Sequence, residues 1–251
     1  MRNYYIKKSD WKAIYQTLKT IKGIRIKNQF VTRKFVESVY FIMRTGAQWR
    51  ELPGYYGKWR SIHKRYESWC TKDLWSNILS HFTRDYDGEN IMIDSTIIRA
   101  HPCSAGYKKD SAEAECLGRS KGGFTTKIHA VVDGLGQALR FRLTGGQRND
   151  ITQASELIAG FKGSNIIADK AYDSNRLLEQ IENQECEAII LPRRNRKILR
   201  DFDKDLYKER HLIECFFGKI KHFRRIFARF DKKATSFMGF LAFASLIIWM
   251  R

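Results

Sequence analysis

The 251-residue sequence contains no pair of cysteines in C-x-x-C spacing, and its five cysteines are an odd number. This pattern argues against a disulfide framework and a zinc finger, and it favours reduced thiols in an intracellular protein. The N-terminus also lacks the apolar stretch of a signal peptide, and the apolar segment 237–250 is too short to span a bilayer comfortably. We therefore expect a soluble, cytoplasmic protein without a membrane partner, whose last helix is buried.

Acidic residues are scarce relative to basic ones. Lys and Arg number 46 against 27 Asp and Glu, which gives a formal net charge of +19, more than solubility requires. The cations occur in both halves of the sequence with acids among them, so they do not form a disordered basic tail. We predict that the whole molecule faces a nucleic acid and is associated with the nucleoid.

Residues 9–82 read as helices separated by turns. Trp11, Ile14 and Leu18 have helical spacing, and a second helix is expected to begin at Thr32 as its N-cap and to end at Gly46. After a WRELPG turn, a further helix has aromatic and aliphatic residues on one side and cations on the other, namely Arg60, His63, Lys64 and Arg65. We predict a helix-turn-helix-like, DNA-binding domain over 1–83, contacting DNA through Arg60 and Lys64; alternatively these cations only solvate a helix in a bundle.

The pattern changes at the polar segment 84–90, which we interpret as a linker. From residue 91 the expected order is strand, hairpin, helix, strand, helix, strand and long helix, an α/β domain over 91–251 built around a mixed sheet. A hairpin is expected around 133–136, and Asp150 with Gln153 resembles a capping box. Two short apolar strands, 91–93 and 165–168, each end in a carboxylate, Asp94 and Asp169.

The segment 206–225, LYKERHLIECFFGKIKHFRR, is expected to be one amphipathic helix. At 100° per residue its apolar residues form a stripe that can dock on a core. The opposite face carries a phenol, a guanidinium, a carboxylate and an ammonium, from Tyr207, Arg210, Glu214 and Lys221. Such a face suits a phosphate and a metal ion, although an ordinary solvated face with ion pairs has the same composition.

Three further features leave alternatives open. The basic segment 192–200, with Arg193 and Arg194, is expected to contact phosphates, or else is a solvated run of charge. His101 and Cys103 could bind a metal, but the sequence offers no partner pair for them. Asp173 competes with Asp169 as the acid of its motif, and we expect it to serve as a turn residue or to support the site from behind.

The three acids at the ends of structured elements, Asp94, Asp169 and Glu214, indicate a chemistry. In a mixed sheet the two aspartate-bearing strands can be neighbours, with the helical glutamate closing over them. Carboxylates suit Mg²⁺, and two ions about 3.5–4 Å apart can activate a water or a 3′-hydroxyl and stabilise the leaving oxygen of a phosphodiester. Arg210 and Lys221 would then hold non-reacting phosphates, and Tyr207 would bond a phosphate or stack on a base.

These residues carry a resemblance to a known family. The sequence resembles bacterial insertion-sequence transposases of the DDE type, in the insertion sequence family five branch, over nearly its whole length. The shared motifs, in order, are WRELP, GKW, IDST, GGFTTKIHAVVD, LTGGQ, ADKAYDS, LPRR and Y-x2-R-x3-E-x6-K, the last formed by Tyr207, Arg210, Glu214 and Lys221. Cys215 stands where the family more usually has a polar residue.

The resemblance implies a ribonuclease-H-like fold with Asp94, Asp169 and Glu214 as the catalytic and metal-binding triad. It implies two Mg²⁺ ions, or Mn²⁺ in their place, and double-stranded DNA partners, both the terminal inverted repeats of the element and the target. It further implies cleavage at the element ends, joining of the freed 3′-hydroxyls to target DNA, and a homodimer that brings two ends together. The alternatives are an inactive DNA-binding transposase remnant and a metal-dependent nuclease of the same fold.

Overall fold

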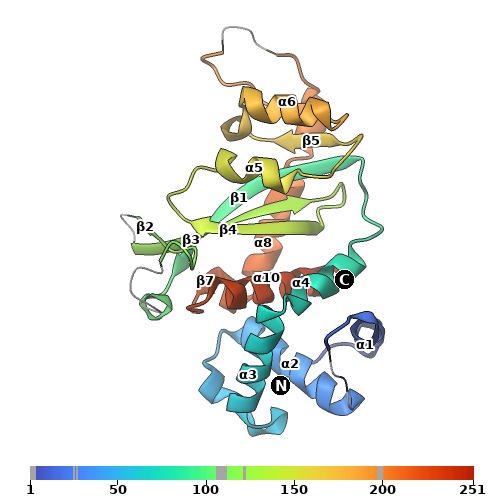
Figure 1. The fold of residues 1–251 in the computed structure, drawn as a ribbon, viewed down its shortest axis with the longest axis vertical. Helices are drawn as coiled ribbons and strands as arrows, with labels where there is room; N and C mark the ends of the chain where they lie inside the picture. Colours follow the sequence, from blue (N-terminus) through green and yellow to red (C-terminus); the bar gives the residue numbers. More distant parts are fainter. Residues whose placement is uncertain (1–3, 25, 27, 106–111, 121–122, 197–199) are drawn as a thin grey trace. The chain divides into compact units, whose positions relative to one another are not determined.

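The computed structural model describes residues 4–24, 26, 28–105, 112–120, 123–196 and 200–251 (Figure 1). The contacts within the chain divide it into two compact units, which we call the basic unit (Met1–Arg84, His101–Lys109 and Ile220–Arg251) and the sheet unit (Asp85–Ala100 and Asp110–Lys219). The boundary after Arg84 lies beside the linker expected at 84–90. Residues 220–251, which the sequence analysis assigned to the domain 91–251, group with the N-terminal residues.

The described part of the basic unit is mostly helical. Its helices are α1 (Lys8–Thr20), α2 (Gln29–Thr45), α3 (Trp59–Thr71), α4 (Leu74–Phe82), α9 (Arg224–Phe227) and α10 (Ala234–Trp249), with the short turns η1 (Trp49–Glu51), η2 (Gly54–Tyr56) and η3 (Pro102–Ser104) and the short strand β7 (Ala228–Arg229). The expected N-cap at Thr32 is wrong: Asn28 caps α2, because its side chain accepts bonds from the N–H groups of Phe30 and Val31. Gly46 ends α2 as expected, at a φ of 71°.

Helix α10 forms the centre of the basic unit. It is apolar on all sides, and most of its side chains are buried, which is the pattern of a helix surrounded by protein. The Tyr66 hydroxyl donates to the Ser236 carbonyl over 2.6 Å, and the Tyr66 ring stacks on Phe240 with centroids 4.6 Å apart. In the part of the chain that the structure describes, no helix has the length and apolar character needed to cross a membrane.

The sheet unit contains a mixed sheet with the strand order β2-β3-β1-β5-β6, and β4 pairs with β3. Its strands are β1 (Asn90–Ala100), β2 (Gly118–Ser120), β3 (Gly123–Val132), β4 (Ala138–Gly145), β5 (Asn165–Ala168) and β6 (Glu187–Ile190), and its helices are α5 (Ile151–Leu157), α6 (Asn175–Asn183), α7 (Lys204–Lys208) and α8 (His211–Lys221), with the turn η4 (Lys170–Tyr172). Strands β1, β3 and β4 are antiparallel, whereas β5 and β6 run parallel to β1. This confirms the predicted ribonuclease-H-like mixed sheet flanked by helices.

The two faces of the sheet are covered by different helices. One face presents Ile91, Ile93 and Ile166, which pack in one buried cluster with residues of α5 and α6. Because side chains alternate along a strand, Met92, Asp94 and Ile167 point to the other face. That face is covered by α8, since the Phe216 ring lies 5.9 Å from the ring of Phe141 on β4. Figure 1 shows α5 and α8 on opposite sides of the strands.

Two expected element boundaries are wrong. Strand β1 does not stop before Asp94 but continues to Ala100, because β3 pairs with it as far as Arg99. The segment 206–225 is not one helix: α7, α8 and α9 are separate, and the backbone of Phe223 is extended. At the first break, the N–H groups of Glu209 and Arg210 bond to carbonyls three residues back, which tightens the chain into a turn.

Candidate active site

Asp94 and Asp169 come from neighbouring parallel strands. Met92 of β1 pairs with Ile167 of β5, and Asp94 and Asp169 each follow two residues later in their segments. Both side chains therefore point to the face covered by α8. Asp169 follows β5 directly, and its carboxylate caps η4 by accepting the Ala171 N–H over 2.7 Å.

Arg210 joins two of the three predicted acids. Its guanidinium donates to Asp94 Oδ2 over 3.0 Å and also forms an ion pair with Glu214. The Asp94 side chain is 19% exposed and the Glu214 side chain 54% exposed. The structure thus brings Asp94 and Glu214 to one cation, with Asp169 beside Asp94.

The carboxyl group of Asp94 has an unusual pKa. Its pKa is raised to about 6: burial and the nearby charges of Asp169 and Asp150 raise it, whereas the Ser95 N–H and Arg210 lower it. The Asp94 carboxylate is therefore largely shielded from water and has other carboxylates nearby. A cation at this point would favour its ionised form.

The donor set of this site suits a hard divalent ion, because every candidate ligand is a carboxylate. Among the described residues, no three His, Cys, Asp or Glu side chains are already grouped closely enough to hold an ion. Instead the Arg210 guanidinium provides the positive charge between Asp94 and Glu214. An ion bound by these carboxylates would require the Arg210 side chain to turn away.

The other members of the Y-x2-R-x3-E-x6-K signature lie in different places. Tyr207 is on α7 and half-buried, and burial followed by the charges of Asp169 and Asp94 raises its pKa, whereas Arg210 lowers it. Tyr207 is thus close to both aspartates. Lys221 is the last residue of α8 and groups with the basic unit. We therefore do not include Lys221 in the carboxylate site.

A polar network that the sequence analysis missed lies on the opposite face of β1. Asp150 Oδ1 accepts the Ser95 hydroxyl over 2.7 Å and Lys127 Nζ over 2.8 Å. It also lies 3.8 Å from Nδ1 of His129, a wholly buried residue, and burial lowers the pKa of that imidazole to about 4. The expected capping box is wrong, because the Asp150 side chain turns to the sheet and makes no cap bond to α5.

This network reaches the active-site face through Ser95. The Ser95 hydroxyl bonds to Asp150, while its backbone N–H donates to Asp94 Oδ1 over 2.7 Å. Ser95 follows Asp94 in the strand, so their side chains point to opposite faces. The sequence does contain a signal for this network. A small polar residue, Ser95, follows the candidate Asp94, and a Lys, Lys127, interrupts the apolar pattern of the neighbouring strand.

Asp173 and the basic segment after β6 form a structural cluster. Although burial acts to raise it, the pKa of Asp173 is lowered by bonds from Arg196 and from the Arg193 N–H. The Arg193 side chain donates to the carbonyls of Lys170 and Ala171 over 3.1 and 2.9 Å. Asp173 and Arg193 therefore support the loop after Asp169, and Arg193 and Arg194 are both exposed to solvent.

The cations expected to contact DNA from α3 have different environments. Arg60 and Lys64 are exposed, and the Arg60 guanidinium lies over the Trp59 ring at 5.4 Å. Arg65 is half-buried over the rings of Phe35 and Trp69, at 4.3 and 5.3 Å. Arg65 is thus a packing residue, and Arg60 and Lys64 remain the cations that α3 presents to solvent.

Comparison with known proteins identifies related sequences. Residues 86–247 match the family model described as a transposase DDE domain, and residues 6–79 match the model of a putative transposase of the IS4/5 family. The putative transposase for insertion sequence element IS6501 of Brucella ovis is 47% identical over 129 residues, covering 51% of this chain and 99% of that protein. The putative transposase for insertion sequence element IS402 of Burkholderia cepacia is 31% identical over 137 residues, covering 49% and 63%.

Two solved structures also match. One is a cryo-EM structure of a piggyBac transposase synaptic complex with hairpin DNA, at 14% identity and a TM-score of 0.42, covering 77% of this chain and 50% of that chain. The other is a crystal structure of a pre-cleavage Mos1 transpososome, at 11% identity and a TM-score of 0.29, covering 92% and 80%. At these scores neither likeness supports an inference.

The family assignment therefore depends on the sequence models and on the curated relatives. Proteins of this family generally use divalent metal ions, and the family's activity is the transposition of DNA. The chain belongs to the DDE transposases of bacterial insertion sequences.

Proposed function

We propose that this protein cleaves DNA at the ends of an insertion sequence and joins the freed 3′-hydroxyls to target DNA, with Asp94, Asp169 and Glu214 as its catalytic residues. The observation that carries the proposal is the convergence of these acids: Asp94 and Glu214 share one guanidinium, and Asp169 lies at the end of the strand beside Asp94. The three come from segments far apart in the sequence. Together they would supply the carboxylates that metal-assisted phosphoryl transfer requires.

The three carboxylates would hold the metal, which we infer to be two Mg²⁺ ions or Mn²⁺ in their place. When bound, such ions activate the attacking water or 3′-hydroxyl and stabilise the leaving oxygen. Asp94 and Asp169 are set by paired strands, so their carboxylates are positioned before DNA arrives. Glu214 is more exposed and lies on helix α8, so it would contribute the third carboxylate from the helix that covers this face of the sheet.

Arg210 and Tyr207 would bind the substrate. If Arg210 turned away from Asp94 and Glu214, its planar guanidinium would be able to bond a DNA phosphate through two N–H groups. Tyr207 can donate its hydroxyl to a phosphate oxygen beside the aspartates. Lys221, Arg194, Arg60 and Lys64 supply charge for the DNA backbone, and Arg193 contributes by supporting the loop after Asp169.

Asp150 and Ser95 would act as positioning residues. Asp150 fixes the Ser95 hydroxyl on one face of β1, and the Ser95 N–H thereby stays directed at the Asp94 carboxylate on the other. Lys127 offsets the charge of Asp150 where both are largely shielded from water. This network touches no reacting atom and serves to hold Asp94.

The test is incubation of the protein with Mg²⁺ and a labelled duplex that carries the inverted repeat flanking its gene. Joined products support the proposal. Cleavage without joining selects a metal-dependent nuclease, and a shifted band without cleavage selects an inactive DNA-binding remnant. A homodimer is expected to hold two such ends, and light scattering of the protein–DNA complex measures this.

A further inference from the structure

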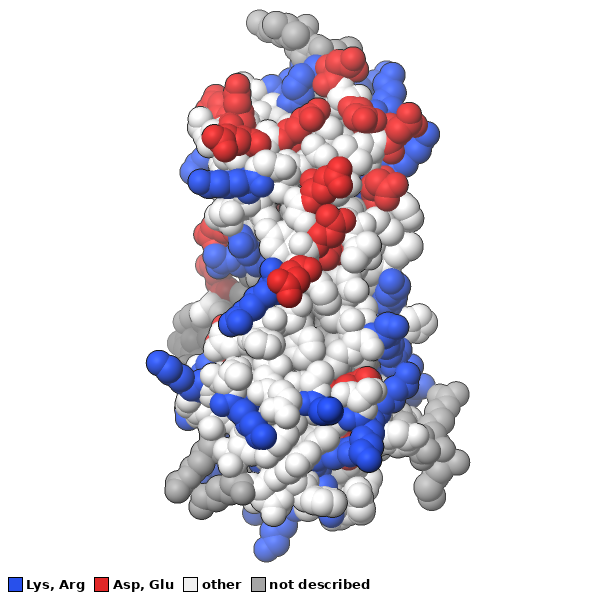
Figure 2. Space-filling model, turned by 90° about the vertical axis from the view of Figure 1, so that its right-hand side faces the viewer, with Lys and Arg blue, Asp and Glu red and all other residues white. Residues whose placement is uncertain are grey.

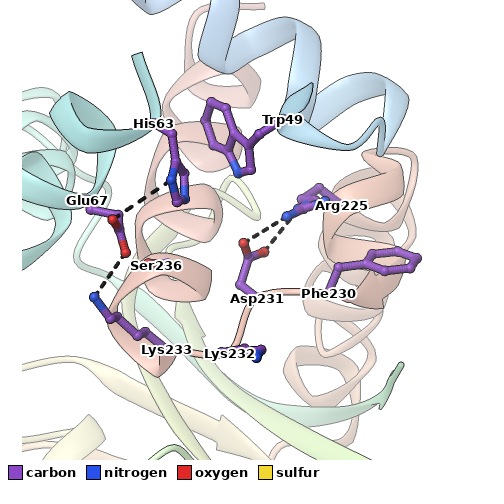
Figure 3. Close-up of a pocket in the computed structure, with 9 residues that line it drawn as sticks. All are labelled: Trp49, His63, Glu67, Arg225, Phe230, Asp231, Lys232, Lys233 and Ser236. Atoms are coloured by element: carbon purple, nitrogen blue, oxygen red, sulfur yellow. Dashed lines mark hydrogen bonds and ion pairs between the residues drawn. The ribbon is translucent and has the colours of Figure 1, made fainter. Parts of the chain in front are cut away.

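The basic unit contains a cavity outside the carboxylate site. It has a volume of about 260 Å³ and lies between η1, α3 and the segment from α9 to α10. Figure 3 shows its lining, which consists of Trp49, His63, Glu67, Arg225, Phe230, Asp231, Lys232, Lys233 and Ser236. At about 30 Å³ per water, this space is far larger than a packing defect.

Aromatic side chains form part of the wall. Trp49 is almost completely buried, and its ring lies 4.9 Å from the imidazole of His63. Phe230 lines the cavity from the segment before α10. The Trp49 indole N–H has no hydrogen-bond partner among the described residues, and in Figure 3 this edge of the ring faces the cavity. The wall therefore offers flat apolar surfaces and a donor that lacks an acceptor.

The charges inside the cavity are balanced. Arg225 forms two bonds with Asp231, at 3.1 and 3.0 Å, and both side chains are buried. Glu67 pairs with Lys233 at 2.9 Å. Burial lowers the pKa of His63, although Glu67, 3.8 Å away, acts to raise it. Arg225 and Lys233 therefore offer no unpaired charge to a buried phosphate, and the remaining lining cation, Lys232, is exposed to solvent.

The surroundings of the cavity are strongly basic, in contrast to its interior. Lys232 lines the cavity and is exposed to solvent. In Figure 2, Lys and Arg side chains with few acids lie over the elements of the basic unit. Phosphates are thus favoured outside the cavity, and a flat, neutral, polar group is favoured within it.

We infer that this cavity binds an unpaired nucleobase of a DNA strand, with the flanking phosphates held by Lys232 and neighbouring cations. A base that leaves its stack is bound elsewhere by aromatic side chains and by bonds to its Watson–Crick edge. Here Trp49 and His63 would contact the base, and the Glu67 carboxylate would accept a bond from an exocyclic amino group. The inference rests on the proposed function only in taking DNA as the partner.

The test measures binding without cleavage, in EDTA. Fluorescence anisotropy compares three short labelled probes: a fully paired duplex, the same duplex with one extra unpaired cytosine, and the same duplex with an abasic residue in its place. The unpaired cytosine is expected to improve the affinity by roughly tenfold, the range of one base stacked on an aromatic ring. The abasic residue should give no improvement.

Variants locate the effect in the cavity. Trp49→Phe and Glu67→Gln are expected to bring the ratio of the two affinities, bulged over paired duplex, close to one. Lys72→Gln, at an exposed cation just after α3, should weaken both probes equally and leave the ratio unchanged. Thermal melting of each variant shows that it is folded, and the ratio cancels any general change in charge.

Two results would overturn the inference. One is equal affinity of the wild-type protein for the paired and bulged duplexes. The other is a preference for the bulged duplex that persists in both folded cavity variants. Neither result bears on cleavage or joining, so a failure here is distinguishable from a failure of the proposed function.

Discussion

The two units of this chain differ sharply in charge. The basic unit holds 27 Lys and Arg against 6 Asp and Glu, and the sheet unit holds 19 against 21, which together make up the 46 and 27 of the chain. The whole positive balance therefore belongs to one unit, and the other is slightly acidic. Figure 2 shows the same contrast, with acidic side chains gathered over elements of the sheet unit.

The sequence analysis predicted that the whole molecule faces nucleic acid. The difference in charge restricts this prediction to the basic unit. Long-range attraction of DNA is expected to come from the basic unit, because phosphate contacts dominate affinity and carry little sequence information. The sheet unit holds the carboxylate site, where acids must lie close together despite their repulsion. Binding and chemistry should thus respond to different substitutions, which the following predictions test in order of effect.

The largest effect is expected from the triad. Asp94→Ala, Asp169→Ala and Glu214→Ala should each lower the rate of DNA cleavage by at least about 1,000-fold, because removing one member of a catalytic unit costs several orders of magnitude in rate, while duplex affinity in EDTA changes little. In the basic unit, the double variant Arg60→Ala, Lys64→Ala should lower duplex affinity and leave the cleavage rate of bound DNA nearly unchanged. Gel assays of cleavage and binding measure both, and full cleavage by any one triad variant would show that the triad is misassigned.

The positioning network should give a smaller loss. Ser95→Ala removes the hydroxyl that bonds to Asp150 and is expected to reduce cleavage about 10–100-fold, whereas Ser95→Thr should restore most of it. Asp150→Asn keeps an acceptor and should be milder than Asp150→Ala. Calorimetric titration with Mn²⁺ gives a second readout, since weaker metal binding is expected in Ser95→Ala. If Ser95→Ala has wild-type activity and metal affinity, the network has only a structural role.

Substituting Asn for two aspartates of the sheet unit, Asp94 and Asp173, should change the free energy of unfolding in opposite directions. The folded-state pKa of Asp94 is raised to about 6, so its charge destabilises the fold above that pH, and Asp94→Asn should add about 1–3 kcal/mol at pH 7 in EDTA. This gain should shrink as the pH falls from 6 towards 4, where the wild-type carboxyl is protonated.

Asp173 is the matched control for this measurement. Its pKa is lowered, so its charge stabilises the fold above the unfolded-state value, and that contribution is lost as the pH falls through the folded-state value. Asp173→Asn should therefore cost about 2–3 kcal/mol at pH 7. Urea unfolding at several pH values measures both variants, and shifts of the same sign would contradict the assigned environments.

The smallest effect concerns salt. Each lost phosphate contact should reduce the slope of log affinity against log salt by about 0.9. Lys64→Gln, in the basic unit, is expected to show this reduction together with a several-fold loss of affinity. Arg176→Gln, at an exposed cation of α6 in the sheet unit, should leave the slope unchanged. Equal reductions in the two variants would remove the division of roles between the units.

Much of the sheet unit could be predicted from local signals. The apolar strands before Asp94 and Asp169 and the hairpin turn at 133–136 both appear in the structure. Each depends on residues close together in the sequence. The same local reasoning failed for the segment 206–225, whose hydrophobic periodicity continues across two breaks of the helix.

Asp150 shows why part of the site could not be predicted. Its spacing to Gln153 fits a capping box, which is a local interaction worth about 1 kcal/mol. In the folded protein Lys127 of β3 and Ser95 of β1 offer it charge-assisted bonds that are stronger. The same applies to Arg193, which the sequence places on a basic loop and the structure bonds to the carbonyls after Asp169.

The sequence by itself determined the family and the alternation of strands and helices, and it predicted the three acids, because motifs and periodicity are properties of the chain alone. Only the tertiary structure decided that residues 220–251 group with the N-terminal helices, that Arg210 lies between Asp94 and Glu214, and that a polar network supports Asp94 from the reverse face of its strand. Those outcomes depend on which distant segments meet and on which partner best satisfies a charge once water is excluded, and the order of residues does not contain that information locally.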